Sequence, residues 1–322
     1  MAEKQLLPVV TGPTASGKTA CAVYLARKMG GEVISADSMQ VFQGMEILSA
    51  APTMEERQGI PHHMIGVAPP TQPFSASIYR EQAAECIRDM ANRGKQPILC
   101  GGTGLYIDAL TRPMSFSQPG DEALRQELHA IADEPGGRQR LHQMLAECDP
   151  ESAARLHPND LRRVVRAIEV YRLTGISLTE HNRRDHARQG DYDERIFALE
   201  WPRDALYARI DRRVEQMLKA GLLKEVRALM RLEKEQPTAV QAIGYKEIAA
   251  ALRGETTLAE GVARMQQASR NYAKRQITWL KRDGRTQWIP AMGRSAEEIA
   301  QDIYERLTIR CQVRNERSGE KM

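Results

Sequence analysis

The sequence predicts an α/β protein in which a parallel sheet is flanked by helices and carries a mostly helical insertion domain. Short apolar runs typical of buried strands alternate with segments whose apolar residues recur at helical spacing. A glycine-rich stretch joins the first apolar run to the first helical segment, and turn-rich pieces fill the middle of the chain. Because strands and helices alternate, we expect a parallel sheet covered by helices on its faces.

The core elements follow in order along the chain. "LLPVVTG" predicts a strand, and "KTACAVYLARKM" predicts a helix that stops at Gly30 and Gly31. "EVISAD" predicts a second strand, residues 75–93 a helix, and "PILCGG" a third strand. After the middle region, "RIFALEW" predicts another strand, and two or three long helices follow it.

These patterns divide the chain into three parts. Residues 1–111 and 196–310 are expected to form the core, and residues 112–195 a helical insertion domain. The polar tail, residues 311–322, is expected to be disordered.

Composition excludes several classes of protein. Apolar residues make up 42% and charged residues 27% of the 322 residues, and no apolar run approaches the roughly 20 residues of a membrane helix. Five scattered cysteines, without a CxxC pair, argue against a disulfide framework and a zinc ribbon. His62 and His63 are adjacent, which is poor spacing for two ligands of one metal. We expect a cytoplasmic enzyme without a membrane segment.

A phosphate-binding loop is the most specific motif. The stretch "GPTASGKT" satisfies G-x-x-x-x-G-K-[ST] between a predicted strand and a predicted helix, which indicates a P-loop NTPase-like sheet. Backbone N–H groups of such a loop turn toward an anion, the lysine adds a charge, and the threonine hydroxyl can ligate Mg²⁺. The alternative is a glycine-rich turn without a ligand. The candidate anion-binding residues are Gly12, Pro13, Thr14, Ala15, Ser16, Gly17, Lys18 and Thr19, with Thr19 as the candidate metal ligand.

An expected acid is missing from the third strand. Hydrolytic P-loop enzymes usually hold Mg²⁺ with an acid at the end of a neighbouring strand, but "PILCGGTG" has none. Asp37 instead ends "EVISAD", where the carboxyl end of a parallel strand faces the ligand crevice. The alternative role of Asp37 is to cap a helix or turn. "GGTGLY" offers Thr103 beside the same crevice, or simply a tight turn. We therefore expect a phosphate site that does not hydrolyse ATP.

Two helical segments are strongly basic. "PNDLRRVVRAIEVYRLTG" carries four arginines against one glutamate, and "GVARMQQASRNYAKRQITWLKRDGR" also carries a basic surface. In either helix alone, such basic side chains more often form a surface that is simply exposed to solvent. Together with a phosphate loop they favour a polyanionic partner.

Seven motifs resemble those of one family, in the same order along the chain. They are "GPTASGKT", "ISADSMQVFQGM", "GIPHHMI", "PILCGGTGLYIDAL", "LHPND" with "RAIEVY", "QAIGYKE" and "YAKRQITWLKR". From about residue 8 to 290 the chain resembles bacterial tRNA dimethylallyltransferases, also called tRNA isopentenyltransferases. The resemblance implies transfer of a dimethylallyl group from dimethylallyl diphosphate to the N6 amine of the adenosine immediately 3′ of the anticodon. It also implies that the loop binds the prenyl diphosphate instead of ATP.

The resemblance also implies roles for single residues. Asp37 matches the general base, Arg213 an arginine that reaches the diphosphate, and Thr103 a residue near the acceptor adenosine. The insertion is expected to grip the anticodon stem-loop, with Mg²⁺ as cofactor, in a monomer. The residues matching tRNA-contacting positions are Asp37, Ser38, Met39, Gln40, Thr103, Arg125, Arg162, Arg163, Arg166, Gln241, Gly244, Tyr245, Lys246, Lys274, Arg275, Gln276, Trp279 and Lys281.

The chain departs from the family pattern at two places. Ala51 stands where the family commonly has a lysine, and Gly66 where it has an aspartate. Two other functions remain open from the residues. A small-molecule or nucleotide kinase shares the loop, the sheet and the insertion, but it does not account for the "KRQITWLKR" helix. A non-catalytic RNA-binding protein does not account for intact Lys18, Thr19 and Asp37.

Overall fold

The chain forms two compact units. The computed structural model describes residues 4–114, 120–186, 188, 190–232 and 238–319, with side chains described as far as residue 308. One unit combines Met1–Thr111 with Tyr192–Met322, and the other is Arg112–Asp191. The boundaries between the units therefore lie at Thr111 and Tyr192, close to the ends of the insertion expected from the sequence.

A parallel six-stranded sheet forms the centre of the first unit. The strands lie in the order β3-β2-β4-β1-β5-β6, and every pair is parallel. Their bounds are β1 Leu6–Thr11, β2 Glu32–Ala36, β3 His62–His63, β4 Pro97–Gly101, β5 Asp193–Glu200 and β6 Thr286–Pro290. The predicted α/β fold with a parallel sheet is confirmed. The sequence patterns did not indicate β3 or β6, which join opposite edges of the sheet.

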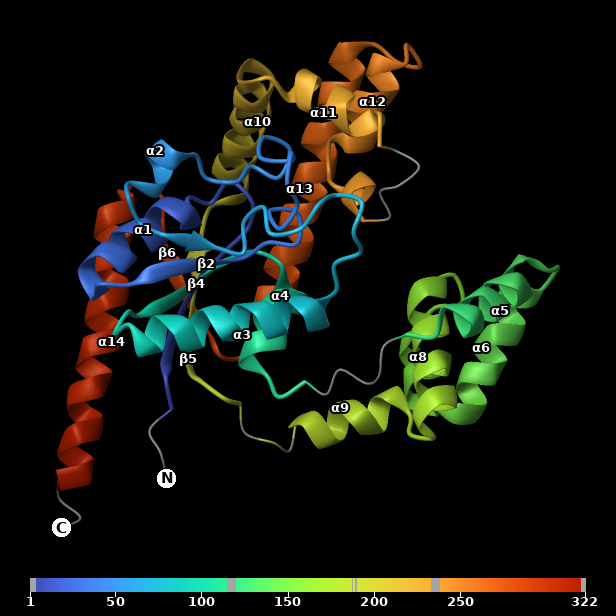
Figure 1. Cartoon of the computed structure of the whole chain (residues 1–322), viewed down its shortest axis with the longest axis horizontal. Coiled ribbons are helices and arrows are strands. Elements are labelled where there is room, and N and C mark those ends of the chain that lie inside the picture. Colours follow the sequence, from blue (N-terminus) through green and yellow to red (C-terminus); the bar gives the residue numbers. More distant parts are fainter. Residues whose placement is uncertain (1–3, 115–119, 187, 189, 233–237, 320–322) are drawn as a thin grey trace. The chain divides into compact units, whose positions relative to one another are not determined.

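Helices cover both faces of this sheet. Alternate residues of the strands point to opposite faces, so that Val10, Ile98 and Phe197 pack in one apolar cluster and Val9, Leu99 and Ile196 in the other. Helices α1 and α14 lie side by side on the first face (Figure 1). The helices of this unit are α1 Lys18–Met29, α2 Met54–Arg57, α3 Ala76–Asn92, α4 Gly104–Thr111, α10 Arg203–Ala220, α11 Leu222–Met230, η2 Ala239–Gln241, α12 Tyr245–Leu252, α13 Leu258–Arg282 and α14 Ala296–Gly319.

The last helix, α14, extends into the segment 311–322. Residues 311–322 are expected to be disordered, but α14 continues as far as Gly319. Residues 320–322 lie outside the described residues. The start of α14 packs its apolar side against the sheet through Ile299, Ile303 and Leu307, and no break in the helix separates this segment from the polar one that follows.

The second unit is a small helical domain. It contains α5 Glu122–Asp133, α6 Gly137–Cys148, α7 Pro150–Arg155, α8 Leu161–Thr174 and α9 Leu178–His186. Its apolar core lies between α5, α6 and α8, around Leu128, Leu141 and Val164. Buried Asp149 caps α7 through the Ser152 N–H at 3.0 Å and binds the Thr179 hydroxyl at 2.7 Å, which ties α7 to α9.

Within the described residues, none of the helices is both long and apolar enough to cross a membrane.

An ionic cluster around buried Glu32 links the start of β2 to His63 of β3. The Glu32 carboxylate accepts hydrogen bonds from Arg93 Nη2 and His63 Nε2, both at 2.8 Å. The hydrogen bond from Arg93 is the main reason why the pKa of Glu32 falls to about 2. Because the folded-state pKa is depressed, the stabilisation is present above the unfolded-state pKa and is lost as the pH falls toward about 2.

We expect Glu32→Gln to lower the free energy of unfolding by roughly 2–3 kcal/mol at neutral pH. The difference from the unmodified chain should shrink as the pH falls below the unfolded-state pKa of a glutamate, and urea unfolding across that range measures it. Glu85→Gln is the matched control, because Glu85 is exposed and its ion pair with Arg88 is long, at 4.0 Å. A pH-independent difference for Glu32→Gln would contradict this assignment.

Candidate functional site

The loop between β1 and α1 has three residues with positive φ angles. Gly12, Ala15 and Gly17 have φ angles of 147°, 62° and 91°, a region that side chains disfavour. A Cβ at Gly12 would lie 2.9 Å from the Ser16 hydroxyl and 3.3 Å from the Leu199 backbone nitrogen. The glycine at this position is therefore required by both conformation and space.

Side chains from distant elements hold the carbonyl side of this loop. Trp201 Nε1 donates to the Ser16 carbonyl at 2.9 Å, and Arg209 Nε donates to the Ala15 carbonyl at 2.7 Å. The Arg209 guanidinium also stacks over the Trp201 ring at 4.2 Å. The sequence motifs gave no signal for either residue, because both lie some 185 to 194 positions from the atoms that they bind.

The other side of the loop presents donors and positive charge. No side chain caps the start of α1 at Gly17, so the first-turn N–H groups remain open to a ligand. The Ser16 hydroxyl is buried and has no hydrogen-bond partner within the described part of the chain. Burial, and secondly the nearby Arg213, lower the pKa of Lys18. Such a set of groups fits a bound anion.

Asp37 follows β2 and lies in a tight turn. Its Oδ1 accepts the Met39 N–H at 2.9 Å, the turn-capping role weighed for it from the sequence. Thr103 is fixed against the same turn, because the Thr103 N–H donates to Ala36 O at 3.0 Å and Ser38 N–H donates to Thr103 Oγ1 at 3.0 Å. The fold therefore brings the turns after β2 and β4 together.

Asp37 lines two neighbouring cavities. The larger, about 270 Å³, extends from Thr14 and Asp37 past Arg213 to the apolar side chains of Val214 and Met265. The smaller, about 10 Å³, has room for about one water molecule. It is lined by Lys18, Thr19, Val33, Ser35, Asp37, Gln40, Pro52, His62, Cys100 and Gly101.

Arg213 is a half-buried cation that lines the larger cavity. Its Nη2 donates to the Ala50 carbonyl at 3.0 Å, and burial lowers its pKa while Asp37 opposes that change. The adjacent Cys100 does not supply a counter-charge, because burial raises the pKa of its thiol to about 11. Lys18 and Arg213 therefore both lie near the Asp37 carboxylate, and Arg213 also interacts with Glu56 and Arg209.

The two departures from the family pattern, Ala51 and Gly66, lie in loops that are held by hydrogen bonds. Glu225 accepts the N–H groups of Ile47 at 2.8 Å and Leu48 at 2.6 Å, so the segment containing Ala51 is held without a lysine. Gly66 has a φ angle of 61° and donates its N–H to Gln40 O at 2.8 Å.

The oxygen atoms near the loop suit the expected Mg²⁺. Within the described residues, no group of three or more His, Cys, Asp or Glu side chains could hold a metal ion. His63 instead binds Glu32, and His62 Nδ1 binds Ile60 O at 2.8 Å. Thr19 and Asp37 line the small cavity. Mg²⁺ keeps most of its waters and takes ligands from substrate phosphates, so this sparse oxygen set suits it.

The residues in and near α13 that are expected to contact tRNA differ in their exposure to solvent. Lys274, Arg275 and Lys281 are exposed, and so are Lys246 and Gln241. Tyr245 is 2% and Gln276 5% exposed, which does not fit the expected contact of their side chains with RNA. Gly244 has a φ angle of 98°, and a Cβ there would lie 2.6 Å from Met265 Cε, so backbone geometry and packing explain this glycine.

In the helical unit, an ion cluster orients two of the expected arginines. Buried Glu169 binds Arg125 Nε at 2.8 Å and Arg166 Nη1 at 2.6 Å. Arg162 and Arg163 are exposed, and Arg163 also binds Asp160 at 2.8 Å. The cluster holds Arg125 of α5 and Arg166 of α8 on the same carboxylate.

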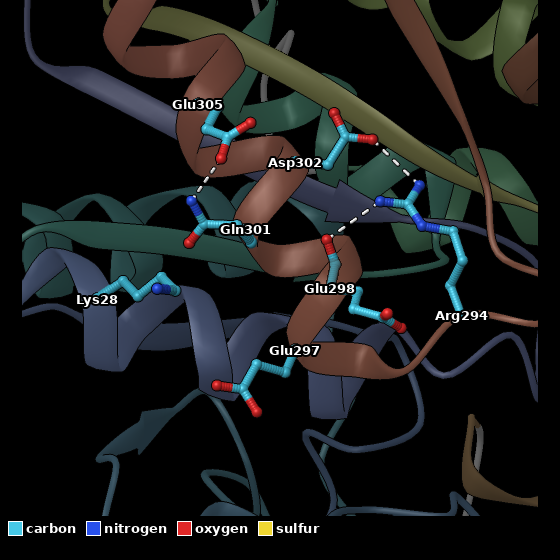
Figure 2. A pocket seen from close by; sticks show the side chains of 7 residues that line it. All are labelled: Lys28, Arg294, Glu297, Glu298, Gln301, Asp302 and Glu305. Atoms are coloured by element: carbon cyan, nitrogen blue, oxygen red, sulfur yellow. Dashed lines mark hydrogen bonds and ion pairs between the residues drawn. The ribbon is translucent and has the colours of Figure 1, made fainter.

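A separate hollow of about 460 Å³ lies between α1 and α14 (Figure 2). Arg294 in it binds Asp302 at 3.1 Å and the Glu298 carbonyl at 3.1 Å, and Gln301 binds Glu305. None of the site residues expected from the sequence lines this hollow.

Comparisons with known proteins identify the family of this chain. A family model described as IPP transferase matches residues 40–283. A tRNA dimethylallyltransferase of Carboxydothermus hydrogenoformans is 41% identical over 304 residues, covering 94% of this chain and 97% of that protein. One from Geobacillus thermodenitrificans is 44% identical over 289 residues, covering 89% and 90%.

Two solved structures are also similar. A tRNA delta(2)-isopentenylpyrophosphate transferase from Staphylococcus epidermidis is 39% identical with a TM-score of 0.70, covering 95% of this chain and all of that one. A eukaryotic dimethylallyltransferase acting on tRNA is 30% identical with a TM-score of 0.78, covering 90% and 74%. The resemblance found in the sequence motifs is confirmed, and this chain belongs to the tRNA dimethylallyltransferase family.

Proposed function

We propose that this chain transfers a dimethylallyl group from dimethylallyl diphosphate to the N6 amine of the adenosine immediately 3′ of the tRNA anticodon. The products are N6-isopentenyladenosine in the tRNA and free diphosphate. The observation that carries the proposal is the position of Asp37, which lines both the 270 Å³ cavity and the small cavity beside Lys18 and Thr19. A base at this junction is within reach of an acceptor entering the larger cavity and of a donor held by the loop.

The loop at residues 12–19 binds the diphosphate of the donor. Its open N–H groups, Lys18 and Arg213 carry the positive charge that compensates the diphosphate as it leaves. Mg²⁺, held by Thr19, water and the diphosphate, would add further charge neutralisation when bound. The apolar part of the cavity, beyond Arg213, suits a short hydrocarbon group.

Asp37 acts as the general base on the acceptor. The exocyclic amine of adenine is a weak nucleophile, because its lone pair is delocalised into the ring. As the new C–N bond forms and the C–O bond to diphosphate breaks, the amine proton passes to the Asp37 carboxylate. The Met39 N–H and the turn that carries Thr103 keep that carboxylate in place.

The acceptor is the anticodon stem-loop of a tRNA. The target adenosine must leave the loop stack to enter a cavity, and a loop base is comparatively easy to extrude. The exposed cations of α13 bind phosphates beside the core, and the helical unit, with Arg125, Arg162, Arg163 and Arg166, grips the stem-loop. All these groups come from a single chain, so we expect that a monomer is sufficient for activity. We expect the protein to act in the cytoplasm, where tRNA is present.

The direct test uses purified protein, Mg²⁺, labelled dimethylallyl diphosphate and unmodified tRNA with adenosine at the target position. We expect label on that adenosine without ATP. A parallel reaction contains ATP in place of the prenyl donor. Phosphate transfer or release from ATP, without prenylation in the first reaction, would support a kinase instead.

We expect Asp37→Asn to lower kcat by about 10²- to 10⁴-fold while tRNA affinity stays within twofold. The amide keeps an oxygen for the Met39 N–H but cannot accept the amine proton. Single-turnover prenylation and tRNA binding titrations measure the two effects. Asp204→Asn, at the exposed start of α10, is the control. A kcat close to that of the unmodified chain would remove Asp37 from the chemistry.

We expect Lys18→Met to weaken binding of both inorganic diphosphate and dimethylallyl diphosphate by about 10- to 100-fold, because a hydrogen bond to a charged group is lost. Titration calorimetry in the presence of Mg²⁺ measures both ligands. Lys28→Met provides the control, since Lys28 is exposed in the last turn of the same helix. Equal losses in the two variants would contradict the loop assignment.

We expect Lys274→Ala to weaken tRNA binding and to reduce the slope of log affinity against log salt by about one phosphate contact. Fluorescence titrations at several salt concentrations measure this slope. Lys95→Ala, an exposed lysine before β4, serves as the control. An unchanged slope for Lys274→Ala would mean that its ammonium does not meet a phosphate.

A further inference from the structure

Gln276 is a buried polar side chain in the middle of α13. It is 5% exposed, and both ends of its amide are engaged by backbone atoms. Its Oε1 accepts the Thr14 N–H at 2.8 Å, and its Nε2 donates to the Gly102 carbonyl at 2.9 Å. The side-chain amide of Gln276 therefore provides hydrogen-bond partners for two backbone groups, the Thr14 N–H and the Gly102 carbonyl.

The contact of α13 with the turn after β4 leaves no spare room. A Cβ at Gly102 would lie 2.2 Å from Gln276 Nε2, and a Cβ at Gly104 would lie 2.5 Å from the Trp279 ring. Two glycines of "GGTGLY" therefore allow Gln276 and Trp279, one turn apart on α13, to reach the backbone. The distance between α13 and this turn is set by that packing.

The two backbone groups belong to the two halves of the proposed reaction. Thr14 lies in the loop that binds the diphosphate. Gly102 directly precedes Thr103, whose hydroxyl accepts the Ser38 N–H beside Asp37. A continuous polar path thus leads from the donor loop through Gln276 to the turn that carries the base.

We propose that Gln276 is a positioning residue, which sets the donor loop and the Asp37 turn at the separation that the transfer requires. This inference rests on the proposed function. Gln276 touches neither substrate; it acts through Thr14 on the diphosphate and through Gly102 and Thr103 on the base. Displacing reacting groups by about 1 Å can cost about 10²-fold in rate, so such a bridge contributes to turnover without binding RNA.

The first variant is Gln276→Met, which keeps the length and volume of the side chain but removes both hydrogen bonds. We expect kcat at saturating substrates to fall by about 10- to 100-fold, with a several-fold weaker affinity for dimethylallyl diphosphate. The affinity for tRNA should stay within twofold. Gln301→Met is the matched control, because Gln301 makes an exposed hydrogen bond to Glu305 on α14 (Figure 2).

The second variant, Gln276→Glu, separates the two bonds. A carboxylate still accepts the Thr14 N–H but repels the Gly102 carbonyl, whereas the protonated acid can donate to that carbonyl. Burial raises the pKa of an introduced carboxyl group, so protonation occurs in an accessible range. We expect near-normal donor affinity, and a kcat relative to the unmodified chain that rises as the pH falls from about 8 to about 6.

The outcomes separate this inference from the proposed function. If the unmodified chain does not prenylate tRNA, the proposed function fails. If it does, and Gln276→Met loses only thermal stability with an unchanged kcat, or loses mainly tRNA affinity, Gln276 is not a positioning residue. Should Gln276→Met not fold, the pH profile of Gln276→Glu decides, and a flat ratio to the unmodified chain would overturn the inference.

Discussion

The site depends on the strained loop between β1 and α1. Gly12, Ala15 and Gly17 have positive φ angles, and the start of α1 has no side-chain cap, so its first-turn N–H groups can donate to an anion. The opposite, carbonyl side is held from outside by Trp201 and Arg209. This conformation is costly in isolation. It persists because Trp201, directly after β5, and Arg209 of α10 satisfy two of the loop's carbonyls.

Two cations, Lys18 and Arg213, lie beside this loop. Lys18 and Arg213 are half-buried near Asp37, and desolvation is the main cause of the lowered pKa of each cation. The end of β4 adds no acid, and the structure gives the reason. A Cβ at Gly101 would lie 2.2 Å from the Ala36 carbonyl, so no side chain fits there. The acidic group, Asp37, instead directly follows β2.

The part of the fold that was predicted from the sequence consists of buried, locally patterned elements. β1, β2, β4 and β5 have apolar runs because parallel strands in the middle of a sheet are covered on both faces. β3 is two histidines paired with Val33 and Ile34, and β6 is a mostly half-buried edge strand. Their strand character comes from a neighbour in space, so short-range patterns carry little signal for them.

The sequence by itself determined the phosphate loop, the acid after β2 and the family, because each depends on residues that are adjacent or follow one another in a recognisable order. The tertiary structure decided how those pieces are joined. Gln276 looked like part of a basic, RNA-facing helix, but α13 turns it inward to Thr14, which lies 262 positions away. Arg125 and Arg166 looked like independent cations, but both bind buried Glu169. Helical spacing shows which residues share a face, whereas only packing against distant segments decides what that face meets.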